Sequence, residues 1–174
     1  RTRIASELVD TVGFDAIRGN VSELKALALG SATTRGVDAS AADAVTDARL
    51  DEMVSFSKGY AREVGGIVAI TGAIDLVADE ETCYVIRNGR AEMGRVTGTG
   101  CMLSGVLCAY LIANPKDKLE AAAAAVCLMG LAGEVGWSRM QEGDGNATYR
   151  NRIIDAIYNI DGEQLDREAC YELR

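Results

Sequence analysis

The sequence predicts a layered α/β domain in which helices flank a mostly parallel central sheet. Residues 67–70 form an unbroken apolar run, which is typical of a strand buried on both faces between helices. Around this run, segments with apolar residues at helical spacing alternate with short extended segments. The length of 174 residues suits a single domain, residues 1–174.

Helices are expected where apolar side chains recur every three or four positions between a cap and a glycine. In the first helix Ile4, Leu8 and Val12 share one face. The second can be capped by Asn20, and Glu23 three residues later completes a capping box. The predicted helices cover residues 2–12, 20–30, a segment from Ser40 or Asp43 to about Val64, and residues 100–113, 117–140, 147–160 and 162–173.

Extended segments are expected between these helices. A short one covers residues 14–17, and residues 74–78 and 82–87 form a hairpin across an acidic turn. Asn88 and Gly89 then give a strong turn signal. The alanine-rich helix of residues 117–140 is interpreted as a core element, because small residues allow close helix packing.

The composition narrows the possible partners and compartment. Eighteen basic and 26 acidic residues give a net charge of −8, which argues against a nucleic-acid partner. No apolar run reaches the roughly 20 residues that span a bilayer, so no membrane partner is expected. The five cysteines are scattered without metal-site or disulfide spacing, which favours a reducing cytoplasm. The absence of histidine excludes imidazole-based triads and metal sites.

Residues 96–105 carry the strongest chemical signal. Gly98 and Gly100 flank Thr99 directly before a predicted helix, whose free N–H groups and positive dipole end would hold an anion such as phosphate. The Lys-Ser/Thr pair of a Walker A loop is absent. Cys101 stands at the start of this helix, a position typical of reactive cysteines. The alternative is a glycine-rich helix start with a small buried cysteine.

Two further segments lie at junctions between predicted elements. Thr71 and Gly72 follow the buried strand, at the edge where ligands of open α/β sheets bind. Arg18, Asn20 and Glu23 surround the start of the second helix. For Asn20 and Glu23 the capping box is also a good structural explanation.

The three segments together resemble the hydroxyethylthiazole kinase family of the ribokinase-like superfamily. The family's Arg-Gly-Asn-x-x-Glu corresponds to residues 18–23, its Ile-Thr-Gly-x-x-Asp to residues 70–75, and its Val-Thr-Gly-x-Gly-Cys to residues 96–101. Residues 36–38 match a further family segment. The resemblance implies a ribokinase-like fold, of which this chain would be the C-terminal two thirds. The sheet would then be incomplete at its N-terminal side, with the rest either missing or on a companion chain.

The resemblance also implies an activity, the ATP- and Mg²⁺-dependent phosphorylation of the hydroxyl of 4-methyl-5-(2-hydroxyethyl)thiazole in thiamin biosynthesis. Cys101 would be the catalytic base, where most ribokinase relatives carry Asp, and Glu23 would act on Mg²⁺ together with Asn20. A cytoplasmic homotrimer is the implied assembly. The residues expected around ATP are Arg18, Asn20, Thr71, Gly98, Thr99 and Gly100, with Gly98 also against the acceptor.

Two other functions stay open at this point. A hydroxymethylpyrimidine or hydroxymethylpyrimidine-phosphate kinase of the same superfamily can also carry Gly-Thr-Gly-Cys. A non-catalytic nucleotide-binding subunit would explain an incomplete acceptor pocket.

Overall fold

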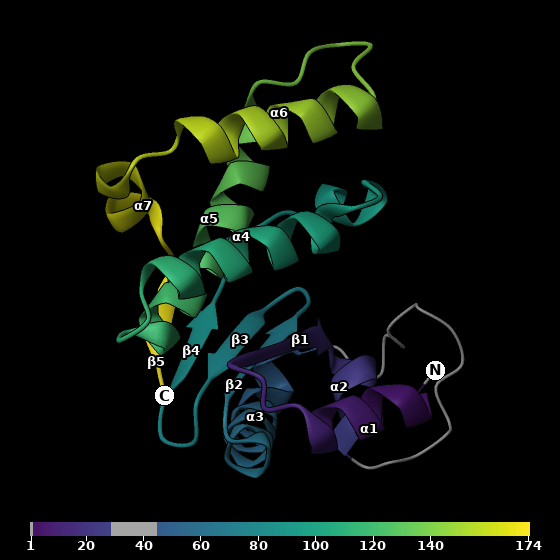
Figure 1. Ribbon diagram of the computed structural model, residues 1–174. Helices are drawn as coiled ribbons and strands as arrows, with labels where there is room; N and C mark the ends of the chain where they lie inside the picture. Colours follow the sequence, from purple (N-terminus) through teal and green to yellow (C-terminus); the bar gives the residue numbers. More distant parts are fainter. Residues whose placement is uncertain (1, 29–44) are drawn as a thin grey trace. The chain divides into compact units, whose positions relative to one another are not determined.

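The computed structural model describes residues 2–28 and 45–174, which form two compact units. The first unit comprises residues 1–85 and 173–174, and the second comprises residues 86–172 (Figure 1). The predicted helix starts at Ser40 or Asp43, and the family segment 36–38, lie outside the described residues.

A five-stranded sheet runs through the chain in the order β1-β2-β3-β4-β5. β1 pairs in parallel with β2, whereas β2 and β3 are antiparallel. The parallel pair is therefore β1 and β2, and each of these two strands ends within a candidate segment. The strands are β1 (Ala16–Asn20), β2 (Ile67–Thr71), β3 (Asp75–Ala78), β4 (Cys83–Ile86) and β5 (Tyr171–Leu173).

The helices of the first unit are α1 (Thr2–Thr11), α2 (Val21–Ala28) and α3 (Leu50–Val64), with a 3-10 turn η2 (Asp47–Arg49) before α3. β2 is buried at residues 67–70, as its unbroken apolar run predicts. Leu24 of α2, Met53 of α3 and Ile70 of β2 are fully buried in one cluster. Burial of each such side chain contributes about 1.5–3 kcal/mol, and this packing fixes the helices on the sheet.

The turn between α3 and β2 requires both of its glycines. Gly65 ends α3 in the left-handed conformation, with φ of 66°, as helix C-caps commonly do. Gly66 follows, and a Cβ there would collide with the carbonyl oxygen of Phe14. The close approach lets Ile67 N–H donate to the Asp15 carbonyl at 3.0 Å, next to the first β1–β2 pair.

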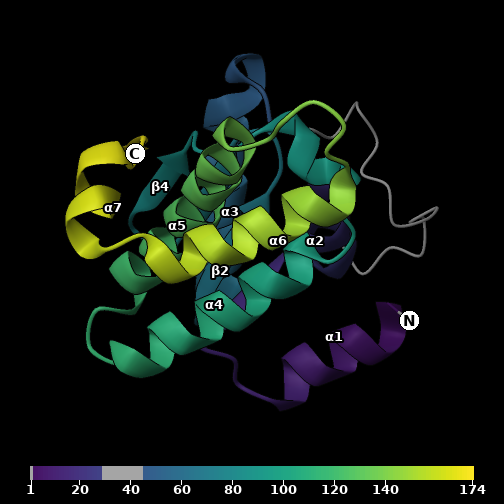
Figure 2. The ribbon, with the colours of Figure 1, turned by 90° about the horizontal axis from the view of Figure 1, so that it is seen from above.

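In the second unit α4 (Thr99–Ala113) and α6 (Asn146–Asn159) both pack against α5 (Lys118–Ser138), as Figure 2 shows. α7 (Gly162–Glu168) and the 3-10 turn η3 (Ala91–Arg95) complete the unit. The alanines of α5 are largely buried, which confirms their interpretation as core. Gly130 has no space for a Cβ, because the Asn88 backbone would lie 2.6 Å away.

Three boundaries differ from the sequence prediction. Arg18, Gly19 and Asn20 belong to β1, because the strand continues beyond residue 17 alongside β2. Val45 and Thr46 are not helical, so the predicted long helix begins at Leu50 among the described residues. The last predicted helix ends at Glu168 and is followed by β5, whose neighbour Arg174 exchanges two backbone hydrogen bonds with Cys83.

α5 also corrects the expectation that no segment could span a bilayer. Its length and hydropathy are sufficient by composition alone. However, 78% of its most apolar 18-residue window is buried by the protein itself. Such burial is typical of a core helix.

Candidate functional site

The first unit brings Asn20 and Thr71 together at the carboxyl ends of two parallel strands. Asn20 ends β1, Thr71 ends β2, and the two residues are direct partners in the β1–β2 register. The Thr71 hydroxyl also donates to the Gly19 carbonyl, at 3.4 Å. The edge of the sheet at which α/β proteins bind ligands therefore carries two of the predicted site residues.

Glu23 and Asn20 form the capping box that the sequence predicts. The Glu23 N–H donates to Asn20 Oδ1 and the Asn20 N–H donates to Glu23 Oε2, both at 2.9 Å. Gly19 has little room beside them, since a Cβ would lie 3.2 Å from Glu23 Cβ. Glu23 is nevertheless exposed, and its capping contact uses one carboxylate oxygen. The second oxygen is available for another role.

Arg18 lies two residues before Asn20 and places a positive charge near the same edge. Its Nε is buried and has no hydrogen-bond partner among the described residues. The Arg18 charge also acts on Asp75, the first residue of β3. Burial raises the pKa of the Asp75 carboxyl to about 7, although a hydrogen bond from Gly72 and the Arg18 charge both oppose the rise.

Asp75 is a residue whose role the sequence did not reveal. It ends the segment 70–75 that carries the family resemblance, yet a lone aspartate after a turn gives no signal of its own. The structure shows that its Oδ1 accepts from the Gly72 N–H at 2.7 Å. Asp75 therefore belongs to the same group of residues as Thr71 and Arg18.

The second unit carries the glycine-rich segment 96–101. Gly98 has φ of 99°, in the region that favours glycine, and it is the N-cap residue of α4. No side chain caps this helix, and its first helical bond runs from the Met102 N–H to the Gly98 carbonyl at 2.9 Å. The N–H groups of the first turn are thus left for an anion, because a helix cannot satisfy them itself.

Cys101 is exposed in the first turn of α4. The alternative of a small buried cysteine is therefore wrong for this residue, although it fits Cys83 and Cys127, which are both buried. Thr99 is oriented by its own backbone, since its hydroxyl donates to the Val96 carbonyl at 3.3 Å. The exposed residue in this turn that can exchange a proton is the thiol.

The residues present fit a nucleoside triphosphate with Mg²⁺, although they do not form a complete set of metal ligands by themselves. Among residues 2–28 and 45–174 no cluster of three or more acidic or cysteine side chains could hold a metal ion. Mg²⁺ keeps several waters and is commonly held by one or two carboxylates plus substrate phosphates. Glu23, with one carboxylate oxygen outside its capping contact, meets that requirement.

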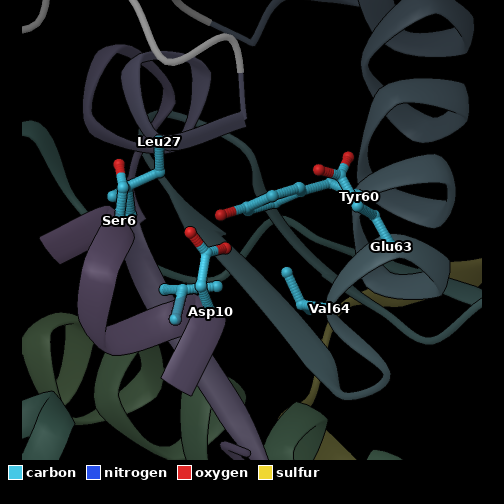
Figure 3. Close-up of a pocket in the computed structure, with 7 residues that line it drawn as sticks. Ser6, Asp10, Leu27, Tyr60, Glu63 and Val64 are labelled. Carbon is cyan, nitrogen blue, oxygen red and sulfur yellow. The ribbon is translucent and has the colours of Figure 1, made fainter. Parts of the chain in front are cut away.

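One cavity of about 300 Å³ lies elsewhere in the first unit, between α1, α2 and α3. Figure 3 shows the Tyr60 hydroxyl pointing between Ser6 and Asp10. Tyr60 has a raised pKa, because of burial first and then the charges of Glu63 and Asp10. None of the predicted site residues contributes to this cavity.

Comparison with known proteins places the chain in context. The model of the Hydroxyethylthiazole kinase family matches residues 1–163. A hydroxyethylthiazole kinase of Clostridium acetobutylicum is 49% identical over 172 residues, which cover 99% of this chain and 63% of that protein. One of Clostridium tetani is 34% identical over 169 residues, covering 97% and 60% respectively. The chain thus spans about three fifths of the length of the curated relatives it matches.

Solved structures agree with this placement. The hydroxyethylthiazole kinase protein of Pyrococcus horikoshii OT3 superimposes with a TM-score of 0.80 at 26% identity, covering all of this chain and 60% of that one. A possible 1-phosphofructokinase of Thermotoga maritima has a TM-score of 0.55 at 16% identity, which bears on the fold alone. The fold is the ribokinase-like α/β fold. Within it, the chain belongs to the hydroxyethylthiazole kinase family.

Proposed function

We propose that the protein carrying this chain transfers the γ-phosphoryl group of ATP to the hydroxyl of 4-methyl-5-(2-hydroxyethyl)thiazole, a step of thiamin biosynthesis. Family membership supports the reaction class. The structural observation that carries it is Cys101, which is exposed at the start of a helix that no side chain caps. An anion-holding turn and a group that can accept a proton are adjacent there, as transfer to an alcohol requires.

The backbone of residues 98–101 is proposed to stabilise the transferring phosphoryl group. In phosphoryl transfer the charge spreads over the equatorial oxygens, and positioning and electrostatics supply most of the catalysis. N–H groups fixed by a helix start need no reorganisation when that charge develops. Gly98 supplies the turn and also contacts the acceptor, while Thr99 and Gly100 contact the phosphates.

Cys101 is proposed as the base. The acceptor's O–H proton passes to the Cys101 sulfur, which acts as the thiolate and becomes the thiol, as the acceptor oxygen bonds to the γ-phosphorus. The bond from that phosphorus to the β–γ bridging oxygen breaks, and ADP leaves with the electron pair. A positioned base of this kind contributes about 10²–10⁴-fold to the rate.

The residues of the first unit are proposed to bind the rest of ATP and the metal. Arg18 and Thr71 contact the nucleotide, and the orphaned Nε of Arg18 supports this role, because a buried donor requires an acceptor. Glu23 and Asn20 hold Mg²⁺ through water. The metal, when bound, neutralises charge on the phosphates.

The assembly is part of the same proposal. The resemblance implies a homotrimer in the cytoplasm, in which the part of the relatives' length that this chain does not span would supply much of the acceptor pocket. That part would belong to the same chain or to a companion. The net charge of −8 argues against a nucleic-acid partner, which would require clustered positive charge.

The test is phosphoryl transfer by the purified protein, measured as ADP release with the thiazole alcohol and with hydroxymethylpyrimidine in parallel. Magnesium-dependent turnover that prefers the thiazole alcohol is the expected result, and EDTA should abolish it. Preference for the pyrimidine would favour the sister kinase. ATP binding without transfer to either alcohol would favour a non-catalytic nucleotide-binding subunit.

A further inference from the structure

Asp75 closes the turn that carries Thr71. β2 ends at Thr71 and β3 begins at Asp75, so three residues connect two antiparallel strands. The register pairs Ile70 with Leu76, and continuing it by one step sets Thr71 opposite Asp75. The Asp75 Oδ1 then accepts from the Gly72 N–H at 2.7 Å. The turn is thus closed by a side chain at its end.

The glycine in this turn does not set the turn's shape. Gly72 has no positive φ, and a Cβ on it would meet the Ile74 carbonyl at 3.6 Å, an ordinary contact distance. The hydrogen bond from its N–H to Asp75 is therefore the specific constraint on where the chain leaves β2. Loss of that acceptor would leave the N–H without its partner and release the turn.

Asp75 also interacts electrostatically with Arg18 of β1, the strand on the other side of β2. The Arg18 charge partly opposes the rise of the Asp75 pKa that burial causes, so the two groups are within electrostatic range. Arg18 lies opposite Ala69 in the β1–β2 register, two positions from the Asn20–Thr71 pair. The carboxyl group is therefore linked to Arg18 and to Thr71, two of the residues that are proposed to contact ATP.

We propose that Asp75 is a positioning residue, whose carboxyl oxygen holds the turn after β2 so that Thr71 meets ATP in line with Arg18. The inference rests on the proposed function, because it takes Thr71 and Arg18 as nucleotide contacts. Asp75 itself touches a backbone N–H and no reacting atom. A positional error of about 1 Å in such a contact can cost on the order of 10²-fold.

Asp79 provides a matched control at the opposite end of the same strand. Its Oδ1 accepts from the Thr82 N–H at 2.6 Å and the Glu81 N–H at 2.8 Å, closing the β3–β4 turn. Asp79→Ala removes the same kind of turn closure far from Thr71 along β3. It should destabilise the fold without changing nucleotide affinity.

The experiment compares Asp75→Ala, Asp75→Asn and Asp79→Ala in the protein that carries this chain. The readouts are the melting temperature, the ATP Kd and the hydrogen-exchange protection of the Gly72 amide. Asp75→Ala should lose protection at Gly72 and raise the ATP Kd about tenfold, because the Gly72 N–H donor then has no acceptor and the turn is released. Asp75→Asn keeps an oxygen acceptor of similar size, so its Kd should stay within about twofold of wild type.

Three outcomes would overturn the inference. In the first, Asp75→Ala binds ATP as wild type does. In the second, Asp79→Ala weakens ATP binding equally, which would make the effect general destabilisation. In the third, folded Asp75→Asn weakens binding tenfold, so that the charge and not the acceptor matters; this outcome decides the question even if the alanine variant does not fold. A wild-type protein that protects Gly72 but binds no ATP would instead refute the proposed function.

Discussion

In the first unit, side chains hold the candidate residues in place, whereas at the start of α4 in the second unit the backbone alone shapes the glycine-rich turn. Asn20 and Glu23 exchange two hydrogen bonds of 2.9 Å, and Asp75 fixes the turn after Thr71. α4, by contrast, begins with no side-chain cap behind a glycine at φ of 99°. The difference indicates a division of labour, since satisfied side chains fix geometry and unsatisfied N–H groups remain to bind an anion.

Two glycines show the same contrast. Gly19 of the first unit is needed for space, because a Cβ would lie 3.2 Å from the Glu23 side chain. Gly98 of the second unit has nothing within 4 Å of such a Cβ and is needed for its backbone conformation. Substitutions in the first unit should therefore disturb packing and hydrogen bonds. Substitutions at the start of α4 should instead lower catalytic activity or introduce backbone strain.

The largest effect is expected at Cys101. Cys101→Ala should lower kcat by about 10²–10⁴-fold if proton acceptance is its main contribution, and less if the N–H groups and Mg²⁺ supply most of the rate. The melting temperature should hardly change, because the side chain is exposed. Turnover and thermal denaturation of the purified variants measure both quantities.

Cys108 is the matched control for that prediction, since it is a second exposed cysteine on the same helix. Cys108→Ala should keep wild-type turnover. Cys101→Asp should fold and retain transfer, because the site is exposed and a carboxylate near a helix N-terminus is favourable. A fully active Cys101→Ala beside an inactive Cys101→Asp would end the catalytic assignment.

The sequence predicted the helices and the central strand well, because apolar periodicity reports burial directly. It missed β5, since Tyr171 and Leu173 lie on an edge strand that is mostly exposed and has no buried face to leave a pattern. It also ended the first extended segment at residue 17, before Arg18, because pairing with β2 extends β1 beyond its apolar residues. Long-range pairing of this kind is not encoded in local spacing.

Some features of the candidate site could likewise be predicted from the sequence, whereas others could not. The Asn20–Glu23 capping box was predictable, because both residues lie within one turn of chain. Asp75 was not, because its significance depends on Gly72 and on the Arg18 charge from another strand. The exposure of Cys101 also had to come from the structure, since its neighbours Leu103 and Leu107 are buried on the same helix.

A second prediction concerns the pH dependence of folding stability and tests whether the titration of Asp75 affects the stability of the first unit. The folded-state pKa of Asp75 is about 7, above the ordinary value of 3.8. Between these values the folded state binds more protons than the unfolded state, so stability falls as pH rises. Asp75→Asn lacks this dependence, so its stability relative to wild type should rise by about 2–3 kcal/mol from pH 5 to pH 8.

Urea denaturation at several pH values measures that gain. Asp144→Asn serves as a comparison of opposite sign. Hydrogen bonds from Gln141 and Arg152 lower the Asp144 pKa, so its stabilising contribution is present above the ordinary pKa and is lost in acid. A difference between Asp75→Asn and wild type that does not vary with pH would contradict the prediction.

A third prediction separates the two roles of Glu23. Glu23→Gln keeps an oxygen that can accept from Asn20, so the capping box and the melting temperature should persist. It removes the charge that attracts Mg²⁺, and activity should fall about tenfold with a raised Mg²⁺ requirement. Kinetics at varied Mg²⁺ concentration and thermal denaturation give the two readouts.

Glu23→Ala is the informative partner of that variant. It removes both charge and cap, and should therefore lower the melting temperature as well as the activity. If Glu23→Gln were as active as wild type while Glu23→Ala melted earlier, Glu23 would have a structural role alone.

The smallest effect is expected from Gly98→Ala, which acts on the backbone of the second unit. Nothing would touch the added methyl group, so any cost comes from holding alanine at φ of 99°. That cost is about 1–2 kcal/mol and should lower the melting temperature by a few degrees.

Gly105→Ala, farther along α4, is the control: its Cβ also meets nothing within 4 Å, and its φ is not positive. Alanine favours a helix interior over glycine by about 0.5–1 kcal/mol, so this variant should melt slightly later. Differential scanning calorimetry resolves shifts of opposite sign. Equal shifts for the two variants would show that α4 does not require the positive φ at its N-cap, and the backbone-shaped half of the comparison would fail.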